Sequence, residues 1–551
     1  MTINCDSDAV SMAQRLLDSA TRNHQFSNWS GTAKCAPDLH VIPSSEDEVA
    51  ALISHLYTSN TSSNSQRYSV KVVGAGHSMS DLACVDSGWK RTTFFASNPL
   101  IMDHIDSNNH ANEMSNHANS TPTTVMVDLS RLDKVLDIDK VNRQVTVQAG
   151  MRLHDLNDAL EQNGLALSSI GSISEQSIGG LIATATHGTG IKYGTISSMV
   201  KSLVLVDGTG KVIECSAAEN EDVFSAARCH IGCLGVVLKC TLQCEDAFDL
   251  DTEQVPVVFR DTLADLENGV VRSAQHVRMW WFPYTNRAVV WRANRAPFGA
   301  GINSVQGNNS GSCVWYSLYC VIKGLSRYGF SLFGRLWSWL RDTFHGFHLL
   351  QLELFATRFA PSIIPWLAHH HFYTRFNRTI VSRDVSHRAF NFDCLFEQYT
   401  SEWAVPLRNT SAALSELADW LESDETTKRQ GVYLHFPVEI RFTGADNDPA
   451  INAVPGSEIW LSPNATEDMC YIGVIMYRPY GRPVRYRKVW AKYEEIMRKH
   501  EGRPHWGKTH TMAPQELGAV YPQYDKFSQM RRQLDPSGLF VNDYIRRHFV
   551  V

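Results

Sequence analysis

Residues 70–81, VKVVGAGHSMSD, join an alternating apolar run to a glycine-rich turn that carries a histidine. Gly74 and Gly76 can adopt backbone angles that other residues avoid, so the chain can approach a ligand closely. Successive backbone N–H groups in such a turn form a concave site for an anion. His77 adds an imidazole nitrogen that could attack an electrophilic cofactor. The turn therefore predicts a phosphate cradle, a point of covalent attachment or, most simply, a structural turn.

Two other chemistries fit this turn poorly. The dinucleotide fingerprint needs a third glycine three residues after the second, and that position holds Met79. GHSMS is one residue away from the G-x-S-x-G motif of serine hydrolases, but Ser80 stands where glycine is needed, and DLACVDSG is a poor helix. These departures exclude a Rossmann site and leave a serine hydrolase as an outside alternative.

A second glycine-rich segment, GSISEQSIGGLIATATHGTGIKYG, spans residues 171–194. Its run of small residues is unsuited to a regular core strand. It suits backbone laid against a large flat ligand, with N–H and hydroxyl donors facing polar atoms. Two such segments in one α/β region fit a large, elongated cofactor better than either segment alone.

Glu439 and Arg441, in VEIRF, are two residues apart. On a strand this spacing places both side chains on the same face, where a carboxylate and a guanidinium could bind and activate a hydroxyl group. The alternative is a cross-strand ion pair on the protein surface.

The bulk composition limits the classes of protein. A chain of 551 residues predicts two or three domains, and a net charge of −6 gives no basic field for nucleic acid. The N-terminus has no apolar segment typical of a secretory signal, so mostly free thiols in a reducing compartment are expected for the 12 cysteines. The pairs between Cys229 and Cys244 are separated by three residues, which favours buried thiols over a zinc ribbon.

The segment from residue 313 to about residue 373 is rich in aromatic and apolar residues interrupted by Lys and Arg. No apolar run reaches the roughly 18 to 20 residues of a membrane span. The composition suits a segment that lies in a membrane interface. A pair of buried core helices and a surface for a partner protein are the alternatives.

The first half of the chain predicts α/β structure. We expect a strand at 68–73, two strands within 124–150, a helix at 151–164 and a hairpin at 200–216. The polar stretch from Lys90 to Pro122 predicts a surface insertion, with a histidine-rich metal loop as the alternative. From about residue 245, VRMWWFPYTNRAVVWRANR predicts a second domain of alternating strands with exposed arginines.

Together, VVGAGHSMSD, IGGLIATATHGTG, WWFPYTNRAVVWRANR, FPVEIRFT, RPHWGKTHTM and LDPSGLFVNDY resemble the sugar-1,4-lactone oxidases, which belong to the vanillyl-alcohol oxidase type of FAD enzymes. The resemblance implies an α+β, two-domain fold. An FAD-binding domain of the PCMH type (1–245, with the insertion at about 90–122) would be followed by a cap, or substrate, domain with an antiparallel sheet (246–480). Residues 481–551 would return to complete the active site and the FAD domain.

The resemblance also implies the site residues. His77 would be bonded to the flavin, Glu439 and Arg441 would act on the substrate hydroxyl, Lys508 would offset flavin charge, Ser172 would orient the substrate, and Gly171 would leave the flavin open to oxygen. Which group is the base stays open. The residues expected to bind FAD are Val72, Val73, Gly74, Ala75, Gly76, His77, Ser78, Ser172, Ser177, Gly180, Thr184, Ala185, Thr186, His187, Val237, His505 and Lys508. No metal site is predicted.

The activity implied is oxidation of the C2 hydroxyl of D-arabinono-1,4-lactone, or of a related L-gulono- or L-galactono-1,4-lactone, by oxygen. An alditol oxidase acting at C1 of an open-chain polyol is the alternative, and a non-catalytic flavin-binding or membrane-docking protein is a different class. The expected partners are the lactone and oxygen, with no nucleic acid. Because relatives include membrane-bound enzymes, the expected location is intracellular, at a mitochondrial or endoplasmic-reticulum membrane, through peripheral association.

Overall fold

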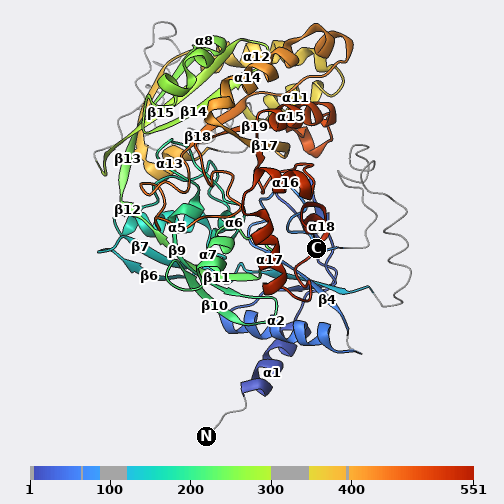
Figure 1. Ribbon diagram of the computed structural model, residues 1–551. Coiled ribbons are helices and arrows are strands. Elements are labelled where there is room, and N and C mark those ends of the chain that lie inside the picture. Colours follow the sequence, from blue (N-terminus) through green and yellow to red (C-terminus); the bar gives the residue numbers. More distant parts are fainter. Residues whose placement is uncertain (1–4, 64–65, 87–120, 300–345, 393–395, 551) are drawn as a thin grey trace, which may run out of the picture.

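The structure is a computed structural model that describes residues 5–63, 66–86, 121–299, 346–392 and 396–550. The predicted insertion at 90–122 lies almost entirely outside these residues, and so does the aromatic segment 313–342. Figure 1 shows a large sheet with its helices at one end of the molecule and two smaller sheets with their helices at the other.

The first small sheet carries the glycine-rich turn. Its order is β3 (Leu39–Val41), β5 (Thr123–Asp128) and β4 (Tyr68–Val73), all parallel. The predicted strand at 68–73 is confirmed as β4. Helix α2 (Glu46–Thr61) leads into it and begins where the Ser45 side chain accepts a hydrogen bond from the N–H of Glu48. The turn at Gly74 therefore leaves the carboxyl end of a parallel strand.

The second small sheet is antiparallel, in the order β10 (Val212–Ser216), β9 (Val200–Val206), β11 (Val236–Gln243), β7 (Gln144–Gln148) and β6 (Val135–Asp139). The hairpin at 200–216 and the helix α5 (Leu153–Gln162) are confirmed. The prediction of two strands within 124–150 is wrong: β5, β6 and β7 are three strands. The chain turns at Leu129–Leu132 and leaves the first sheet for the second.

The large sheet has eight strands, and every neighbouring pair is antiparallel. Their order is β16 (Ile380–Val385), β13 (Phe248–Val258), β15 (Arg287–Pro297), β14 (His276–Phe282), β18 (Val438–Thr443), β19 (Met469–Tyr477), β17 (Gln398–Pro406) and β20 (Arg503–Pro504). The antiparallel cap sheet expected from the resemblance is thus present, and β20 adds a short strand from the C-terminal segment.

One face of the large sheet packs against α14 (Leu407–Glu422) and α15 (Arg487–Lys499). Alternate residues of the central strands, such as Trp403, Ile440 and Ile472, enter this core. The intervening residues face the other way, toward the small sheets. One face of the large sheet therefore packs in a hydrophobic core, and the opposite face carries polar side chains.

The predicted exposed arginines of β14 and β15 need a correction. Arg278 is buried, and its guanidinium stacks over Trp291 at 4.2 Å and over Trp280 at 4.9 Å. Arg292 and Arg295 are half-buried. The reason is that the second face of the sheet is covered at Arg278 by Trp280, Trp291 and Phe392, although β15 reaches solvent near its end.

The C-terminal segment returns to the first sheet through α16 (Pro514–Val520), α17 (Tyr524–Leu534) and α18 (Asp543–His548). In Figure 1 the red segment of α17 and α18 lies beside β4, which is blue and comes from the N-terminal part of the chain. The N–H of Val70 in β4 donates to the carbonyl of Leu539 at 2.7 Å, and the Asn542 amide donates to the carbonyls of Leu82 and Cys84.

The other helices are α1 (Cys5–Asp18), α6 (Ile178–Ala183), α7 (Glu221–Ala227), α8 (Phe259–Ala264), α11 (Gly346–Ala356), α12 (Ile364–His371) and α13 (Ser386–Phe390), and the other strands are β1 (Phe26–Ser27), β2 (Lys34–Cys35), β8 (Leu165–Ala166) and β12 (Glu245–Asp246). Short 3-10 or π turns occur at Ile196–Met199, Leu266–Val270, Pro361–Ile363, Phe372–Phe376, Glu425–Arg429 and Pro479–Gly481. In the described part of the chain, helices with the length and apolarity to cross a bilayer are absent.

Candidate active site

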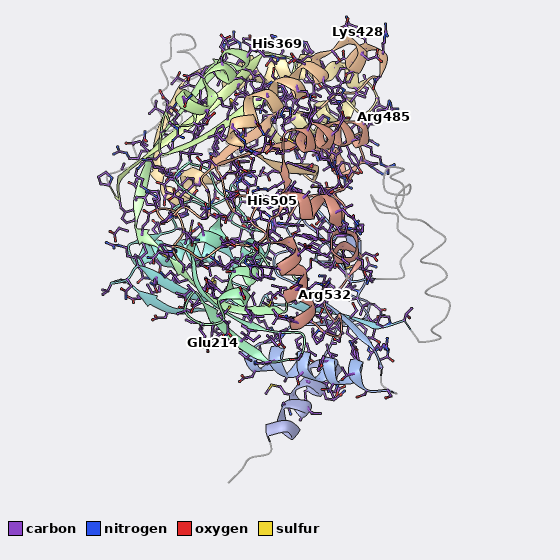
Figure 2. All side chains as sticks on the ribbon, viewed as in Figure 1. Glu214, His369, Lys428, Arg485, His505 and Arg532 are labelled. Carbon is purple, nitrogen blue, oxygen red and sulfur yellow. The ribbon has the colours of Figure 1, made fainter. Side chains whose placement is uncertain are left out.

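A large cavity lies between the glycine-rich segments and the polar face of the large sheet. It contains about 1820 Å³ of empty space, part of it open to solvent. Figure 2 shows His505, one of its lining residues, midway between the two ends of the molecule. The cavity is lined both by the glycine-rich segments and by the large sheet, so a ligand in it would contact both.

The structure brings nearly all of the predicted site residues to this cavity. Those that line it are Val72, Val73, Gly74, Ala75, Gly76, His77, Ser78, Gly171, Ser172, Ser177, Gly180, Thr184, Thr186, His187, Val237, Glu439, Arg441, His505 and Lys508. The exception is Ala185, which is not among the lining residues. It has a φ of 47° and packs into the hydrophobic core beside Ile231. Because its neighbours Thr184 and Thr186 both line the cavity, the sequence contains no indication that Ala185 points away from it.

The glycine wall, residues 72–78 and 171–187, is built mainly from backbone. A Cβ at Gly74 would lie 2.0 Å from the Ser177 hydroxyl, so the two glycine-rich segments touch only because residue 74 has no side chain. Gly76 has a φ of 65°. The backbone N–H groups of residues 75–78 have no acceptor among the described residues. Such a cluster of donors fits an anionic ligand.

His77 projects from this turn. Its Nδ1 lies 3.1 Å from the carbonyl oxygen of Ala75, and its ring is parallel to that of Trp29, with centroids 6.2 Å apart. Burial lowers the pKa of His77, and Arg152 and Lys508 act in the same direction. A neutral ring at neutral pH retains an unprotonated nitrogen, as nucleophilic attachment to a cofactor requires.

The sheet wall is the polar face of β17, β18 and β19, and it is built from side chains. Trp280, Glu439, Gly473 and Glu402 are partners in register across β14, β18, β19 and β17. Gly473 leaves the space between the two carboxylates open: a Cβ there would lie 3.7 Å from Glu402 Oε1. The register therefore places two acids side by side at the cavity.

Arg441 links the two acids. Its Nη2 lies 2.6 Å from Glu402 Oε1, and its Nε lies 3.7 Å from Glu439 Oε2. The Lys508 ammonium lies 3.9 Å from Glu402 Oε2. Ser172, from the glycine wall, donates its hydroxyl to Glu439 Oε1 at 3.3 Å. Two carboxylates and two cations thus meet where the two walls join.

Burial and charge set the protonation of this cluster. Burial would raise the pKa of Glu402, which is 3% exposed, but Arg441, His187 and Lys508 hold that pKa well below its usual range. Burial opposes the charge of Arg441, but Glu439 and Glu402 raise its pKa above the ordinary value. Burial lowers the pKa of His505 to about 3. Glu402 and Arg441 are therefore charged at neutral pH, and His505 is neutral.

The side chains of His187, Glu402 and His505 also have the spacing of a metal site, with one ligand atom of each within 4.8 Å of the others. However, Arg441 occupies Glu402 Oε1 at 2.6 Å, and Lys508 adds a second positive charge. A divalent cation would have to displace or oppose both. This arrangement favours the ion pair over a metal.

Sequence reasoning missed several lining residues, above all Glu402, together with Trp280, Phe392 and Gln398. A signal for Glu402 exists in QYTSEWAVP, where Gln398, Thr400 and Glu402 alternate with Tyr399, Ser401 and Trp403. From the sequence alone such alternation is typical of a strand with one solvated face, so it predicts that Glu402 points away from the core but does not place it in a cavity.

Comparison with known proteins identifies the family. Residues 240–548 match the model described as D-arabinono-1,4-lactone oxidase. L-gulonolactone oxidase of Scyliorhinus torazame is 34% identical over 533 residues, which cover 97% of this chain and 100% of that protein. The chain belongs to the D-arabinono-1,4-lactone oxidase family. L-gulono-1,4-lactone dehydrogenase of Mycobacterium tuberculosis is 29% identical over 95% of this chain and 98% of that protein.

Residues 111–216 of this family member match an FAD binding domain. β4 and its turn precede the matched range. However, β4 pairs with β5, which lies inside that range, so the turn adjoins a sheet of the FAD binding domain. A solved structure of cholesterol oxidase from Brevibacterium sterolicum matches with a TM-score of 0.68 and 14% identity over 97% of this chain and 98% of that chain. The fold is therefore the expected α+β flavoprotein fold, and the protein is an FAD-dependent sugar-lactone oxidase. The unpaired N–H groups of the glycine wall fit this cofactor.

Proposed function

We propose that the protein oxidises the C2 hydroxyl of an aldono-1,4-lactone. The lactone and O2 would give the 2-keto lactone and H2O2, and the keto form would tautomerise to an ascorbate-type enediol. D-arabinono-, L-gulono- and L-galactono-1,4-lactone are the candidate substrates. The observation that carries the proposal is Arg441, held between Glu439 and Glu402 where the glycine wall meets the sheet wall.

When bound, FAD supplies the hydride acceptor, and the chain must take the hydroxyl proton. Glu439 suits this role better than Glu402. Glu402 is bound to Arg441 at 2.6 Å and its pKa is held well below the usual range, so it is a weak base. Glu439 lies farther from Arg441, at 3.7 Å, and its other oxygen accepts from Ser172. Ser172 would in turn orient the substrate hydroxyl.

The remaining residues position the substrate and balance charge. Lys508 lies beside Glu402 and would stabilise the negative charge that develops on the reduced cofactor. Trp280 and Phe392, with ring centroids 6.1 Å apart, offer an apolar surface for the C–H face of a lactone ring. Gly171 places no side chain at the cavity, so oxygen would have an open approach. His77 would carry the flavin covalently.

The first test measures cofactor and reaction together. Acid-precipitated, washed protein should retain flavin absorbance, and native protein should form peroxide with at least one of the three lactones. The acid-precipitated pellet of the His77→Ala variant should be colourless, although the folded variant can still bind FAD. A yellow His77→Ala pellet would refute the attachment. Peroxide from xylitol or sorbitol but from none of the lactones would replace the lactone proposal with an alditol oxidase.

We also propose that the protein attaches peripherally to an intracellular membrane, mitochondrial or of the endoplasmic reticulum. The support is a stretch of large exposed apolar side chains on and around α11 and α12: Leu349, Leu352, Phe359, Trp366 and Tyr373. Phe359 is 76% exposed and Trp366 is 63% exposed. Arg375 and Arg378 follow, also exposed. Apolar anchors beside cations suit an interface with anionic lipids.

Flotation with vesicles of phosphatidylcholine and phosphatidylserine tests this proposal. The native protein should float with the vesicles, and Phe359→Ser with Trp366→Ser should abolish flotation without loss of lactone oxidation. Val381→Ser, on the exposed edge strand β16, is the matched control. A double variant that still floats would contradict this surface as the anchor.

A further inference from the structure

Lys71 is a buried cation in the cavity that the reaction does not use. It lies in β4, three residues before Gly74, and is 1% exposed. Its ammonium donates to the carbonyl of Gly232 at 3.1 Å. Lys71 and Gly232 both line the cavity, as do Gly235 and Val237. This part of the cavity is formed by β4 and the chain around the start of β11.

No carboxylate among the described residues lies within 4.0 Å of the Lys71 ammonium, and the nearby acids are engaged elsewhere. Asp81 pairs with Arg547 at 2.6 Å, and Asp86 pairs with Arg546. Asp535 accepts the backbone N–H groups of Leu539 and Phe540. Lys71 is thus a buried ammonium with a single carbonyl as partner.

A buried charge without a counter-ion is costly, and proteins retain one chiefly where a ligand or a reaction requires it. Burial lowers the pKa of Lys71 to about 8, in spite of the opposing effects of Cys233, Asp86, Asp535 and Asp81. One carbonyl also leaves two of the three ammonium donors available. The site therefore lacks an anion.

We infer that Lys71 binds the pyrophosphate of FAD through its ammonium group. The isoalloxazine, ribityl chain, ribose and adenine of oxidised FAD are neutral at pH 7, so the pyrophosphate is the part of the cofactor that supplies the anion. Lys71 lines the same cavity as the turn at residues 75–78, whose backbone N–H groups have no acceptor among the described residues. Side-chain charge and backbone donors would then act on the same group.

The test uses the His77→Ala background, in which flavin binding is reversible, and compares two ligands by flavin fluorescence titration. Lys71→Met should weaken FAD binding by about ten- to a hundredfold, as expected for hydrogen bonds to a charged group. Binding of riboflavin, which has no phosphate, should not change. Lys201→Met is the matched control, because that ammonium also donates to a backbone carbonyl, of Ala453, but lies outside the cavity lining.

Unchanged FAD affinity in Lys71→Met would overturn the inference. An equal loss of FAD and riboflavin, with a lower melting temperature of the apoprotein, would also overturn it, because it would assign Lys71 to holding the Gly232 turn.

A second measurement does not depend on weak riboflavin binding. FAD affinity should fall above about pH 8 in the protein with Lys71 and stay flat in the Lys71→Met variant, which has no ammonium to deprotonate. The titratable groups that interact electrostatically with the ammonium are unchanged in both proteins, so their titration would act on both curves alike: Cys84, His230, Cys233, Asp81, Asp86 and Asp535. The same pH dependence in both proteins would overturn the inference.

Discussion

The glycine wall and the sheet wall enclose the same cavity by opposite means. The glycine wall makes room by leaving side chains out, and it offers backbone N–H groups from a short run of consecutive residues. The sheet wall presents side chains to the cavity: Glu402 from β17 and Glu439 with Arg441 from β18, and Lys508 of the C-terminal segment lies beside them. The glycine wall is suited to hold a cofactor of fixed shape. The sheet wall is suited to stabilise charge that develops on the substrate and the cofactor during the reaction.

Of the substitutions proposed for the two walls, Arg441→Met should have the largest effect, and it changes only the sheet wall. It leaves Glu402 buried without its closest partner, and breaking a buried pair costs about 3–5 kcal/mol of unfolding free energy. Loss of the donor at the reacting hydroxyl should lower kcat/KM by roughly 10²–10³. Urea unfolding and lactone kinetics measure both effects. Arg383→Met, which breaks an exposed pair with Asp251 in the same sheet, should change neither by much. Unaltered kcat/KM in Arg441→Met would remove Arg441 from the site.

Two matched glycine substitutions test the comparison directly. In Gly74→Ala the new methyl meets Ser177 at 2.0 Å, so the two glycine-rich segments must part, at a cost of about 1–3 kcal/mol. FAD affinity should fall. In Gly473→Ala the methyl meets only ordinary contacts of 3.6 Å or more, so FAD affinity should hold while KM for the lactone rises. FAD titration and steady-state kinetics measure both effects. Weaker FAD binding in Gly473→Ala and a higher KM in Gly74→Ala would contradict the assigned roles of the two walls.

The sheet wall should also determine how stability depends on pH. Because the pKa of folded Glu402 lies below its unfolded value near 4.5, its contribution is present above that pH and is lost as the pH falls toward the folded pKa. Glu402→Gln should therefore be less stable at pH 7 by about 1.5–3 kcal/mol, with a flatter loss of stability below pH 4.5. Chemical unfolding from about pH 3 to pH 7 measures both. Parallel curves for the two proteins would contradict the ion pair.

The smallest expected effect is at Gly171 in the glycine wall. A Cβ there meets the His187 carbonyl at 3.5 Å, the Thr186 methyl at 3.6 Å and the Gln176 side-chain oxygen at 3.9 Å, which are ordinary contacts, so Gly171→Ala should fold normally. The methyl narrows the approach of oxygen and should slow reoxidation about tenfold, which is about 1.4 kcal/mol. Reduction by the lactone should keep its rate in stopped flow. Equal slowing of both steps would argue against a role in oxygen access.

The same contrast explains what the sequence could predict. The glycine wall is local: GAGHS and the run from 171 to 187 bring their residues together by chain connectivity. Of the residues predicted there, only Ala185 does not line the cavity, and its backbone takes a positive φ. Glu439 and Arg441 were predictable because two residues on one strand share a face. Glu402 was not, because only the register of β17 against β19 and of β19 against β18 sets it beside Glu439.

The errors in the fold have related causes. The arginines of β14 and β15 were predicted to be exposed because alternation alone does not say what covers the second face of a sheet. Arg278 is enclosed by Trp280, Trp291 and Phe392, of which Phe392 lies more than a hundred residues away in the sequence. The third strand within 124–150 was missed because a change of sheet at Leu129–Leu132 leaves little trace in the apolar pattern.

Hydrogen bonds join the early strand β4 and its turn to the C-terminal segment: Val70 bonds to Leu539, and Asn542 bonds to Leu82 and Cys84. They have a consequence for synthesis on the ribosome. The strand that carries the cofactor turn is made early, but the residues that bind it are translated hundreds of residues later. While α18 is still in the exit tunnel, the nascent polypeptide lacks these bonds, and Lys508 has only just emerged. A product terminated before this late segment would therefore lack the hydrogen bonds that hold the strand of the cofactor turn in place.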